Sequence, residues 1–208
     1  MPRPRVYDPN HVLDAVESLA VASGPGAVTI RAISAVTGVS NGAVYHTFGS
    51  RSGLMGRAWL RAGRRFLTVQ TSLVDQALSA PSPRASVEAV VDAADAPVIF
   101  AEQYPDSSRL LLTVRRDELL NSRLPDEITT ELSDLDRSLV GLMLRLAINV
   151  WDRKDARAVD AITTCIVDLP TAILLRRDRL SSPTARAHLR AAVRAILAVG
   201  PPPQQHDD

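Results

Sequence analysis

Apolar residues recur at spacings of three and four along most of the chain, and this spacing restricts the fold more than any other feature. It matches the 3.6-residue turn of an α-helix, whereas the alternation typical of strands is scarce and aromatic residues make up only 4%. The sequence therefore predicts an all-α protein of about nine helices. Their expected ranges are 9–22, 29–37, 40–48, 50–78, 85–103, 106–121, 126–151, 156–177 and 184–199. Pro97 and Pro170 fall inside two of these ranges, where each is expected to remove a backbone hydrogen bond and kink the helix.

Two of the expected helices are joined by the three-residue turn Gly38-Val39-Ser40, which predicts a helix-turn-helix. Gly38 tolerates the left-handed backbone that ends the first helix, and Val39 can pack between the two helices. Ser40 caps the second helix and leaves its N-terminal amides, with their positive partial charge, facing outward. The small residues from Asn41 to Ala43 allow this helix to enter a major groove about 12 Å wide. A helix pair alone is a weak signal, because every all-helical protein contains several.

The charge is unevenly distributed, although the whole chain carries a net charge of only +1. Residues 1–65 hold eight basic and three acidic side chains, a net charge of +5, and the remaining residues carry a net charge of −4. A basic segment attached to an acidic one suggests a module that binds a polyanion. Random variation of the surface is an equally good interpretation of the charge alone.

Several classes of protein are disfavoured by what the sequence lacks. No stretch approaches the roughly 20 apolar residues that cross a bilayer, so we expect no membrane span. The N-terminus lacks the apolar core of a signal peptide, which favours a cytoplasmic location. Cys165, the one cysteine, excludes an internal disulfide, and we expect it to be a small buried apolar residue rather than a redox sensor. The four scattered histidines and the lack of a phosphate loop or nucleophile elbow predict no metal, no cofactor and no enzyme activity.

Residues 9–55 resemble, without a gap, the N-terminal DNA-binding domain of the tetracycline-repressor (TetR) family. The residues that carry the resemblance are Val12-Leu13-Asp14-Ala15, Gly24, Thr29-Ile30-Arg31-Ala32-Ile33, Gly38-Val39-Ser40, Gly42, Tyr45-His46, Phe48 and Ser50-Arg51. The resemblance implies an all-helical homodimer, in which a three-helix DNA-binding head precedes a larger helical body that binds a small ligand and dimerises. We therefore expect a head over residues 1–52, an effector-binding and dimerisation domain over 53–200, and a disordered tail over 201–208.

Four positions depart from the family's pattern. Asn41 stands where a basic residue is common, and Arg51 stands where lysine is most common. Gly49 replaces a frequent proline, and Ala20 replaces a large aromatic residue. Asn41 lies where bases are read, so this departure bears on which operator sequence is recognised.

Phosphate contacts are expected from hydroxyl, imidazole and guanidinium donors around the helix-turn-helix. The Thr29 hydroxyl and the Ser40 cap region are expected to hold phosphates, and Tyr45, His46 and Arg51 are expected to add donors. By the resemblance, Tyr45 and Arg51 are the strongest of these candidates. The alternatives are that Thr29 and Ser40 serve only as helix caps, and that Tyr45 packs rather than binds.

Base contacts are expected at the start of the second helix of the motif. The Asn41 amide can pair with adenine, and the Ala43 methyl can touch a thymine methyl, while Gly42 allows close approach. Arg31 can reach a guanine or a phosphate. The arm that carries Arg3 and Arg5 either enters the minor groove or only adds charge, and a solvated arm is the favoured interpretation.

The body is expected to hold an effector pocket that is mostly apolar with a few polar groups. Arg145 and Asn149 lie within an apolar run, which makes them candidate polar anchors. The candidate wall residues are Phe66, Phe100, Tyr104, Leu111, Met143 and Trp151. Ordinary core packing is the alternative for each of them.

The last two expected helices carry more apolar residues than a terminal helix pair needs when one face is solvated. We therefore predict that they form the interface of a homodimer, as the resemblance also implies. The expected interface residues are Ile162, Ile166, Ile173, Leu189, Val193 and Ile196. Packing inside one subunit is the alternative.

The function expected from these observations is sequence-specific, DNA-binding transcriptional regulation. The expected protein is a repressor that leaves a near-palindromic operator on double-stranded DNA when a small-molecule effector binds. Two heads of a dimer dock about one helical turn apart, or a multiple of it, which requires the near-palindrome. The alternative is a ligand-independent or architectural DNA-binding protein of the same fold.

Overall fold

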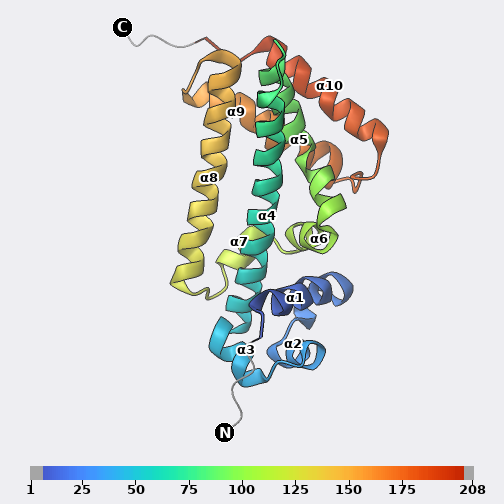
Figure 1. Cartoon of the computed structure of the whole chain (residues 1–208), viewed down its shortest axis with the longest axis vertical. Helices are drawn as coiled ribbons and strands as arrows, with labels where there is room; N and C mark the ends of the chain where they lie inside the picture. Colours follow the sequence, from blue (N-terminus) through green and yellow to red (C-terminus); the bar gives the residue numbers. More distant parts are fainter. Residues whose placement is uncertain (1–6, 204–208) are drawn as a thin grey trace. The chain divides into compact units, whose positions relative to one another are not determined.

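The computed structural model describes residues 7–203, and this part of the chain contains ten α-helices and no strand (Figure 1). The all-α prediction is confirmed. The chain divides into two compact units: unit 1 is Met1–Arg64 with Tyr104–Leu135, and unit 2 is Arg65–Gln103 with Asp136–Asp208. Two long helices, α4 (Arg51–Ser79) and α8 (Asp126–Trp151), contribute residues to both units. These units are defined by packing, and the functional domains expected from the sequence, with a boundary at residues 52 and 53, remain a prediction.

Unit 1 begins with three helices whose starts are fixed by side-chain caps, and the second and third form the helix-turn-helix. The helices are α1 (Pro9–Ser23), α2 (Ile30–Thr37) and α3 (Asn41–Phe48), and the short helix η1 (Pro25–Ala27) lies between the first two. The side chains of Asp8, Thr29, Ser40 and Ser50 each accept a bond from a backbone N–H two or three residues later, at 2.9–3.2 Å. Gly38 has φ +70°, the left-handed conformation that ends α2. The predicted Ser40 cap and the predicted turn at Gly38 are therefore confirmed.

The range 106–121, predicted as one helix, forms two helices. They are α6 (Pro105–Thr113) and α7 (Arg116–Leu120), and Val114 between them is extended. The Val114 side chain is buried in the core of unit 1, and its carbonyl accepts a bond of 3.1 Å from the indole N–H of Trp59 on α4. This packing competes with the local helical preference, so the single-helix prediction was wrong at this point.

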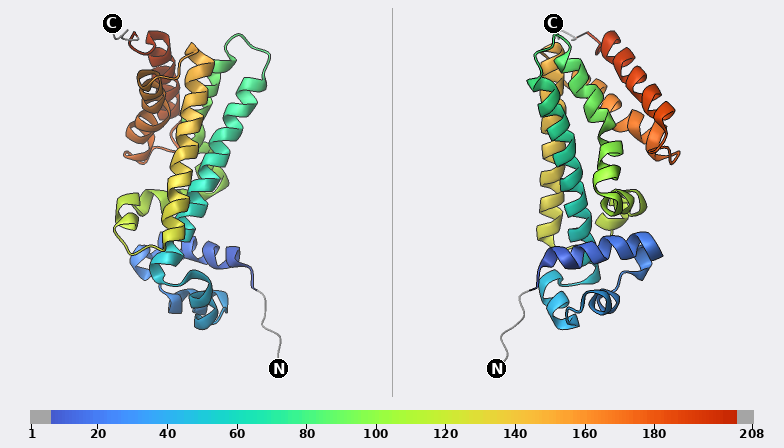
Figure 2. Two further views of the ribbon diagram at one scale, coloured as in Figure 1. Left: turned by 90° about the vertical axis from the view of Figure 1, so that its left-hand side faces the viewer. Right: turned by 45° about the vertical axis from the view of Figure 1, so that its right-hand side comes forward.

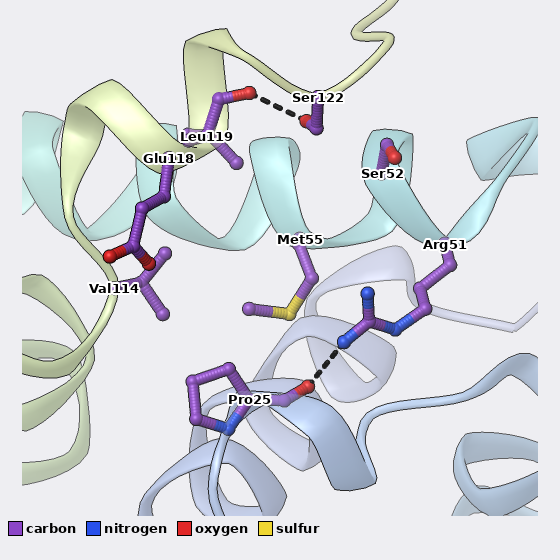
Figure 3. A pocket seen from close by; sticks show the side chains of 8 residues that line it. All are labelled: Pro25, Arg51, Ser52, Met55, Val114, Glu118, Leu119 and Ser122. Carbon is purple, nitrogen blue, oxygen red and sulfur yellow. Dashed lines mark hydrogen bonds between the residues drawn. The ribbon is translucent and has the colours of Figure 1, made fainter.

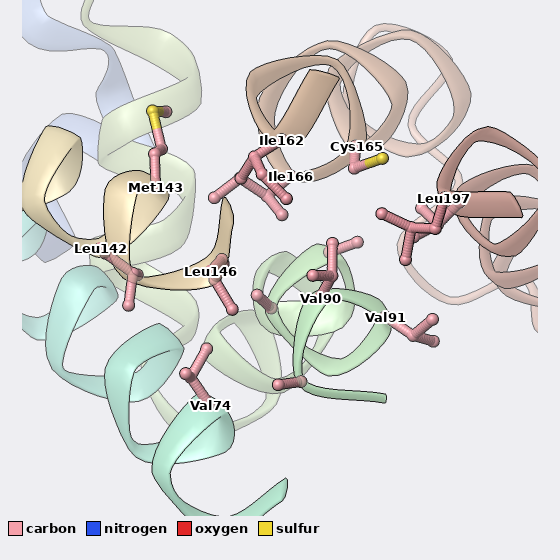
Figure 4. Packing of buried hydrophobic residues seen from close by; sticks show 14 of the residues in the cluster. Val74, Val90, Val91, Leu142, Met143, Leu146, Ile162, Cys165, Ile166 and Leu197 are labelled. Carbon is pink, nitrogen blue, oxygen red and sulfur yellow. The ribbon is translucent and has the colours of Figure 1, made fainter. Parts of the chain in front are cut away.

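Unit 2 is built around α5 (Ala85–Gln103). Almost every residue between Ala89 and Val98 is buried, and a helix that is buried on all sides lies in the centre of its unit. Figure 4 shows Val90 and Val91 of α5 among side chains from α4, α8 and the C-terminal segments. The last helix, α10 (Pro183–Val199), packs along α5 (Figure 2, right).

The helix predicted over 156–177 is interrupted near Pro170, as expected. α9 (Ala156–Thr163) is followed by two wide turns, η2 (Thr164–Asp168) and η3 (Thr171–Leu175), in which an N–H bonds to the carbonyl five residues earlier. Proline lacks the N–H that a regular helix needs, and such wide turns accommodate the interruption.

The segment Ala156–Leu175 is long and apolar enough to cross a membrane by length and composition, so the expectation that no stretch approaches this limit was wrong. Buried helices of ordinary cores meet the same criterion. Ile162, Cys165 and Leu174 from this segment have no exposed surface and fill the core of unit 2.

Ion pairs join α10 to α5 along two full turns. Arginine side chains spaced four residues apart on α10 face carboxylates spaced three and four apart on α5. The pairs are Arg186–Asp95, Arg190–Asp95, Arg190–Asp92 and Arg194–Glu88. Burial lowers the pKa of Arg190, but its bonds to Asp95 and Asp92 outweigh this effect, and the pKa is raised above its ordinary value. The arginine therefore stays charged, and the pairs fix α10 against α5.

The C-terminal residues beyond α10 were predicted to be disordered. The carbonyls of Pro202 and Pro203 accept hydrogen bonds of 2.9 and 2.6 Å from Arg153 and Arg157. Residues 204–208 lie outside the described residues.

A buried hydrogen bond compensates for Pro97 inside α5. Because Pro97 has no N–H, it cannot donate to the carbonyl of Ala93 four residues earlier. The Gln70 side chain of α4 supplies the missing donor, with its Nε2 at 3.0 Å from the Ala93 oxygen. Gln70 is only 1% exposed, so this amide joins α4 and α5 within the interior.

We expect Gln70→Leu to lower the free energy of unfolding by about 1–3 kcal/mol, because the buried Ala93 carbonyl loses its donor. In a Pro97→Ala background the restored backbone N–H can serve that carbonyl, so the same substitution should cost about 1 kcal/mol less. Denaturant unfolding of the four proteins measures this difference. Gln76→Leu, an exposed change on the same helix, is the control. Equal costs of Gln70→Leu in both backgrounds would show that the amide does not substitute for the helical bond.

We expect the buried thiol of Cys165 to make the free energy of unfolding depend on pH. Burial raises the pKa of its thiol from the ordinary 9.0 to about 12. The unfolded thiol loses its proton above about pH 9 while the folded one keeps it, so the stabilising contribution is complete below pH 9 and declines between pH 9 and 12. We expect the difference in unfolding free energy between the wild type and Cys165→Ala to shrink by about 2 kcal/mol from pH 8 to pH 10.5. A difference that stays constant with pH would contradict the burial of the thiol.

Candidate nucleic-acid interface

The exposed surface of α3 is formed by most of the residues predicted to contact DNA. Asn41, Gly42, Tyr45 and His46 are exposed, and Tyr45 keeps 62% of its surface accessible. Ala43 is partly buried, whereas Val44 and Phe48 pack into the core of unit 1. The interpretation that Tyr45 packs is not supported, because a side chain this exposed is available to a ligand. α3 therefore presents an amide, a phenol and an imidazole on a firmly anchored helix.

Thr29 and Ser40 serve as helix caps, the role that we considered as their alternative. Each hydroxyl oxygen accepts a bond from a backbone N–H, at 3.1 Å for Thr29 and 3.2 Å for Ser40. Both residues are exposed, and each hydroxyl hydrogen still has the freedom to donate. Capping and phosphate binding are thus compatible at both positions.

Arg51 has a structural task that the sequence did not reveal. Its Nε donates to the Val28 carbonyl and its Nη2 donates to the Pro25 carbonyl, both at 2.6 Å. Both carbonyls belong to the connection between α1 and α2, so the guanidinium holds this loop against the start of α4. A lysine has no planar fork that could serve both acceptors. Arg51 is thus a positioning residue of the head, and phosphate contact by its remaining donors stays a prediction.

A pocket of about 210 Å³ lies beside Arg51 within unit 1 (Figure 3). Met55 points into it between Pro25 and Val114, and the other residues that line it are Arg51, Ser52, Glu118, Leu119 and Ser122. The Arg51 donors at its wall already bind Pro25 and Val28. The pocket is therefore a small apolar hollow beside the loop that Arg51 holds.

Among the basic side chains counted in residues 1–65, those of Arg57, Arg61 and Arg64 are paired with carboxylates inside unit 1. Arg57 binds Glu127 and Glu131, Arg64 binds Glu131, and Arg61 binds Asp14 and Glu17. Burial raises the pKa of Glu131, but the bonds from Arg57 and Arg64 outweigh it and lower the pKa. The positive charge of the segment is consequently smaller at its surface than the sequence count suggested. Arg31 is exposed, while Arg3 and Arg5 lie outside the described residues.

The sequence did not predict the contacts of Tyr7 with α3 or the exposure of the Val36 side chain. The Tyr7 hydroxyl donates to the Ala43 carbonyl at 3.1 Å and lies within hydrogen-bond distance of the Thr47 hydroxyl, which is on the same side of α3. Tyr7 directly precedes Asp8, the cap of α1, so it joins the start of α1 to α3. Val36 on α2 is 67% exposed. Only long-range packing reveals the contacts of Tyr7, and no local sequence signal marks them.

The predicted effector-pocket residues are divided between the two units. Phe66 and Phe100 form an edge-to-face pair in unit 2 with ring centroids 5.5 Å apart, and Met143 fills the core of that unit. Trp151 packs partly buried against the same core, whereas Tyr104 and Leu111 belong to unit 1.

The two predicted polar anchors of the pocket are exposed rather than buried. Arg145 pairs with Asp75 at 2.5 Å, and the Asn149 amide donates to the Arg145 carbonyl of its own helix. Their role as anchors remains a prediction. The buried polar side chains of unit 2 are instead Gln70 and Asp95.

Four of the six predicted interface residues are buried in the core of their own chain. Ile162, Ile166, Leu189 and Val193 are 0–3% exposed, so they correspond to the alternative of packing inside one subunit. Apolar spacing identified the buried faces of these helices but could not identify what covers them. Ile173 and Ile196 are partly buried.

We expect Tyr7→Phe to weaken binding of duplex DNA by about three- to tenfold, because α3 loses its bonds to the start of α1 while the ring still packs. Fluorescence anisotropy with labelled duplex measures the affinity. Thermal melting controls for loss of fold, and Thr113→Val removes an exposed hydroxyl elsewhere in unit 1 as a control. Wild-type affinity in Tyr7→Phe would rule out this positioning role.

The comparisons with known proteins agree with this geometry. The family profile described as bacterial regulatory proteins, tetR family, matches residues 12–58, which include all of the helix-turn-helix. No match was found among the curated proteins. Three of the similar solved structures are tetR-family regulators.

The regulator from Rhodococcus RHA1 is 21% identical, with a TM-score of 0.64 over 94% of this chain and 98% of that one. One from Mesorhizobium loti MAFF303099 is 14% identical, with a TM-score of 0.68 over 93% and 96% of the two chains. PfmR from Thermus thermophilus is 18% identical, with a TM-score of 0.57 over 90% and 97%. The similarity in fold thus extends far beyond the head, and residues 12–58 match the tetR family of bacterial regulatory proteins.

Proposed function

We propose that this protein is a homodimeric, cytoplasmic repressor that binds a near-palindromic operator and is released from it by a small-molecule effector. The observation that carries the proposal is the exposed face of α3. Its amide, phenol and imidazole groups lie on a helix that is held by the Ser40 cap, by burial of Val44 and Phe48, and by the bond from Tyr7. Such a face can enter the major groove without reorganisation.

Base reading is assigned to Asn41, Gly42 and Ala43 at the N-terminus of α3. An asparagine amide offers one donor and one acceptor, the pattern that adenine presents in the major groove. Tyr45, His46, Thr29, Ser40 and Arg31 supply donors for phosphates, which set the register on the duplex without reading sequence.

Dimerisation is part of the proposal because one head covers only half of an operator. The partly buried Ile173 and Ile196 are the predicted interface residues that still have surface to offer, and four neighbours are committed to the chain's own core. We propose that the outer faces of α10 and of residues 156–175 meet those of a second copy.

Effector control is proposed to act through α4. This one helix contains Arg51, which holds the α1–α2 loop, and Phe66 and Gln70, which belong to unit 2. A ligand that prefers one position of α4 lowers operator affinity by its differential affinity for the two states. The alternative is a ligand-independent DNA-binding protein of the same fold.

Selection of binding sites from random duplex DNA with the purified protein tests the function. We expect a near-palindrome with half-sites about one helical turn apart, or a multiple of it. Asn41→Ala should relax the preference at one base pair of each half-site, whereas Tyr45→Phe should weaken binding to all sequences alike, by about three- to tenfold. Asn121→Ala removes an exposed amide directly after α7; this variant is the control and should bind like the wild type.

Failure to enrich any sequence would refute the proposed function. An unchanged sequence profile in Asn41→Ala would refute its base contact alone.

A further inference from the structure

Gln70 carries a buried polar atom whose hydrogen-bonding capacity is unused. Its Nε2 donates to the Ala93 carbonyl, but its Oε1 has no hydrogen-bond partner among the described residues and is inaccessible to solvent. The amide cannot be turned over to improve this arrangement, because the oxygen would then face the Ala93 oxygen. Pro97 thus fixes the orientation of the amide, since it leaves the Ala93 carbonyl in need of an N–H donor.

A pair of aromatic rings lies on the same two helices as this amide. Phe66 lies one helical turn before Gln70 on α4, and Phe100 lies one turn after Pro97 on α5. These two rings pack edge to face, while Gln70 contacts Ala93, so the same stretches of α4 and α5 hold both the ring pair and the amide. Phe100 is buried, and Phe66 is partly exposed, so the ring pair lies at an accessible edge of this region.

The unpaired acceptor Gln70 Oε1 favours ligands that carry a hydrogen-bond donor. A molecule with an O–H or N–H group gains a bond at Gln70 Oε1 without displacing an existing one. A carboxylate has only acceptor oxygens when ionised, so it would meet the amide oxygen with repulsion and would also lose its hydration.

We propose that Gln70 is the polar anchor of the effector site, and that the effector is a neutral aromatic molecule with one hydrogen-bond donor. The ligand enters past Phe66, stacks against the Phe66–Phe100 pair and donates to Gln70 Oε1. This inference rests on the proposed function, because it names the ligand class of the effector site proposed above. It replaces Arg145 and Asn149, which are exposed, as the polar groups of that site.

Three probes of one ring system test the proposal on the full chain. 2-Naphthol carries a donor, 2-methoxynaphthalene carries only an acceptor, and 2-naphthoate carries a charged acceptor. Isothermal titration with the wild type should show 2-naphthol binding about tenfold more tightly than 2-methoxynaphthalene, and 2-naphthoate binding more weakly than both.

The Pro97→Ala protein is the background for the variants, because Ala93 there keeps a helical donor when Gln70 is changed. Gln70→Leu in this background should bind 2-naphthol and 2-methoxynaphthalene equally. Gln76→Leu, the same exchange at an exposed position of α4, should keep the tenfold preference. No binding of 2-naphthol, no preference in the wild type, or a preference that persists in Gln70→Leu would each overturn the proposal.

Operator binding is measured in the same experiments, so that failure of the Gln70 anchor can be distinguished from failure of the proposed function. Specific DNA binding without a preference for 2-naphthol would refute only the anchor. Preferred binding of 2-naphthol that leaves the operator complex intact would support the anchor and refute release by ligand.

Discussion

The buried carboxylate of Glu17 holds together the three helices on which unit 1 depends. It is 2% exposed and accepts bonds of 3.0 and 2.7 Å from Arg61 on α4 and one of 2.6 Å from Ser107 on α6. An ionised carboxylate is stable in the interior only when its oxygens are satisfied, and removal of one partner of such a pair typically costs about 3–5 kcal/mol. The geometry of α1, α4 and α6 is therefore set by one polar contact, and the apolar core packs around it.

This contact also changes the meaning of the basic N-terminal segment. The excess of arginine first suggested a surface prepared for phosphates. Arg61 instead neutralises Glu17, Arg57 and Arg64 neutralise Glu131, and Arg51 serves two carbonyls. Planar guanidinium groups suit such multiple bonds better than lysine does. In the proposed function, DNA recognition depends on the hydroxyl, amide and imidazole groups of α3 more than on a strong positive field.

The parts of the fold that the sequence predicted are those set by neighbours in the chain. Asp8, Thr29, Ser40 and Gly38 mark helix ends because their effects act over two to four residues. The break at Val114, the bond from Tyr7 to α3 and the donor that Gln70 gives to Ala93 join residues 23 to 55 positions apart. Apolar spacing likewise showed that Ile162 and Leu189 are buried but not whether their own chain or a partner covers them. The helix-turn-helix was predictable because its caps and its turn are local features, whereas the proposed effector site depends on which distant helices meet.

α4 carries both Arg51, which holds the α1–α2 loop, and the proposed anchor Gln70. This arrangement sets a minimum on the binding free energy that an effector has to supply to move α4. A bond to the free Gln70 oxygen is worth about tenfold in affinity, or about 1.4 kcal/mol. Shifting a two-state protein from 1:99 to 99:1 requires a differential affinity of about 5.5 kcal/mol. The hydrogen bond alone is thus too weak, and apolar contact with the Phe66–Phe100 pair has to supply the larger share. In the proposed site, Gln70 selects which aromatic ligand binds, and the burial of the ligand's ring provides the free energy that moves α4.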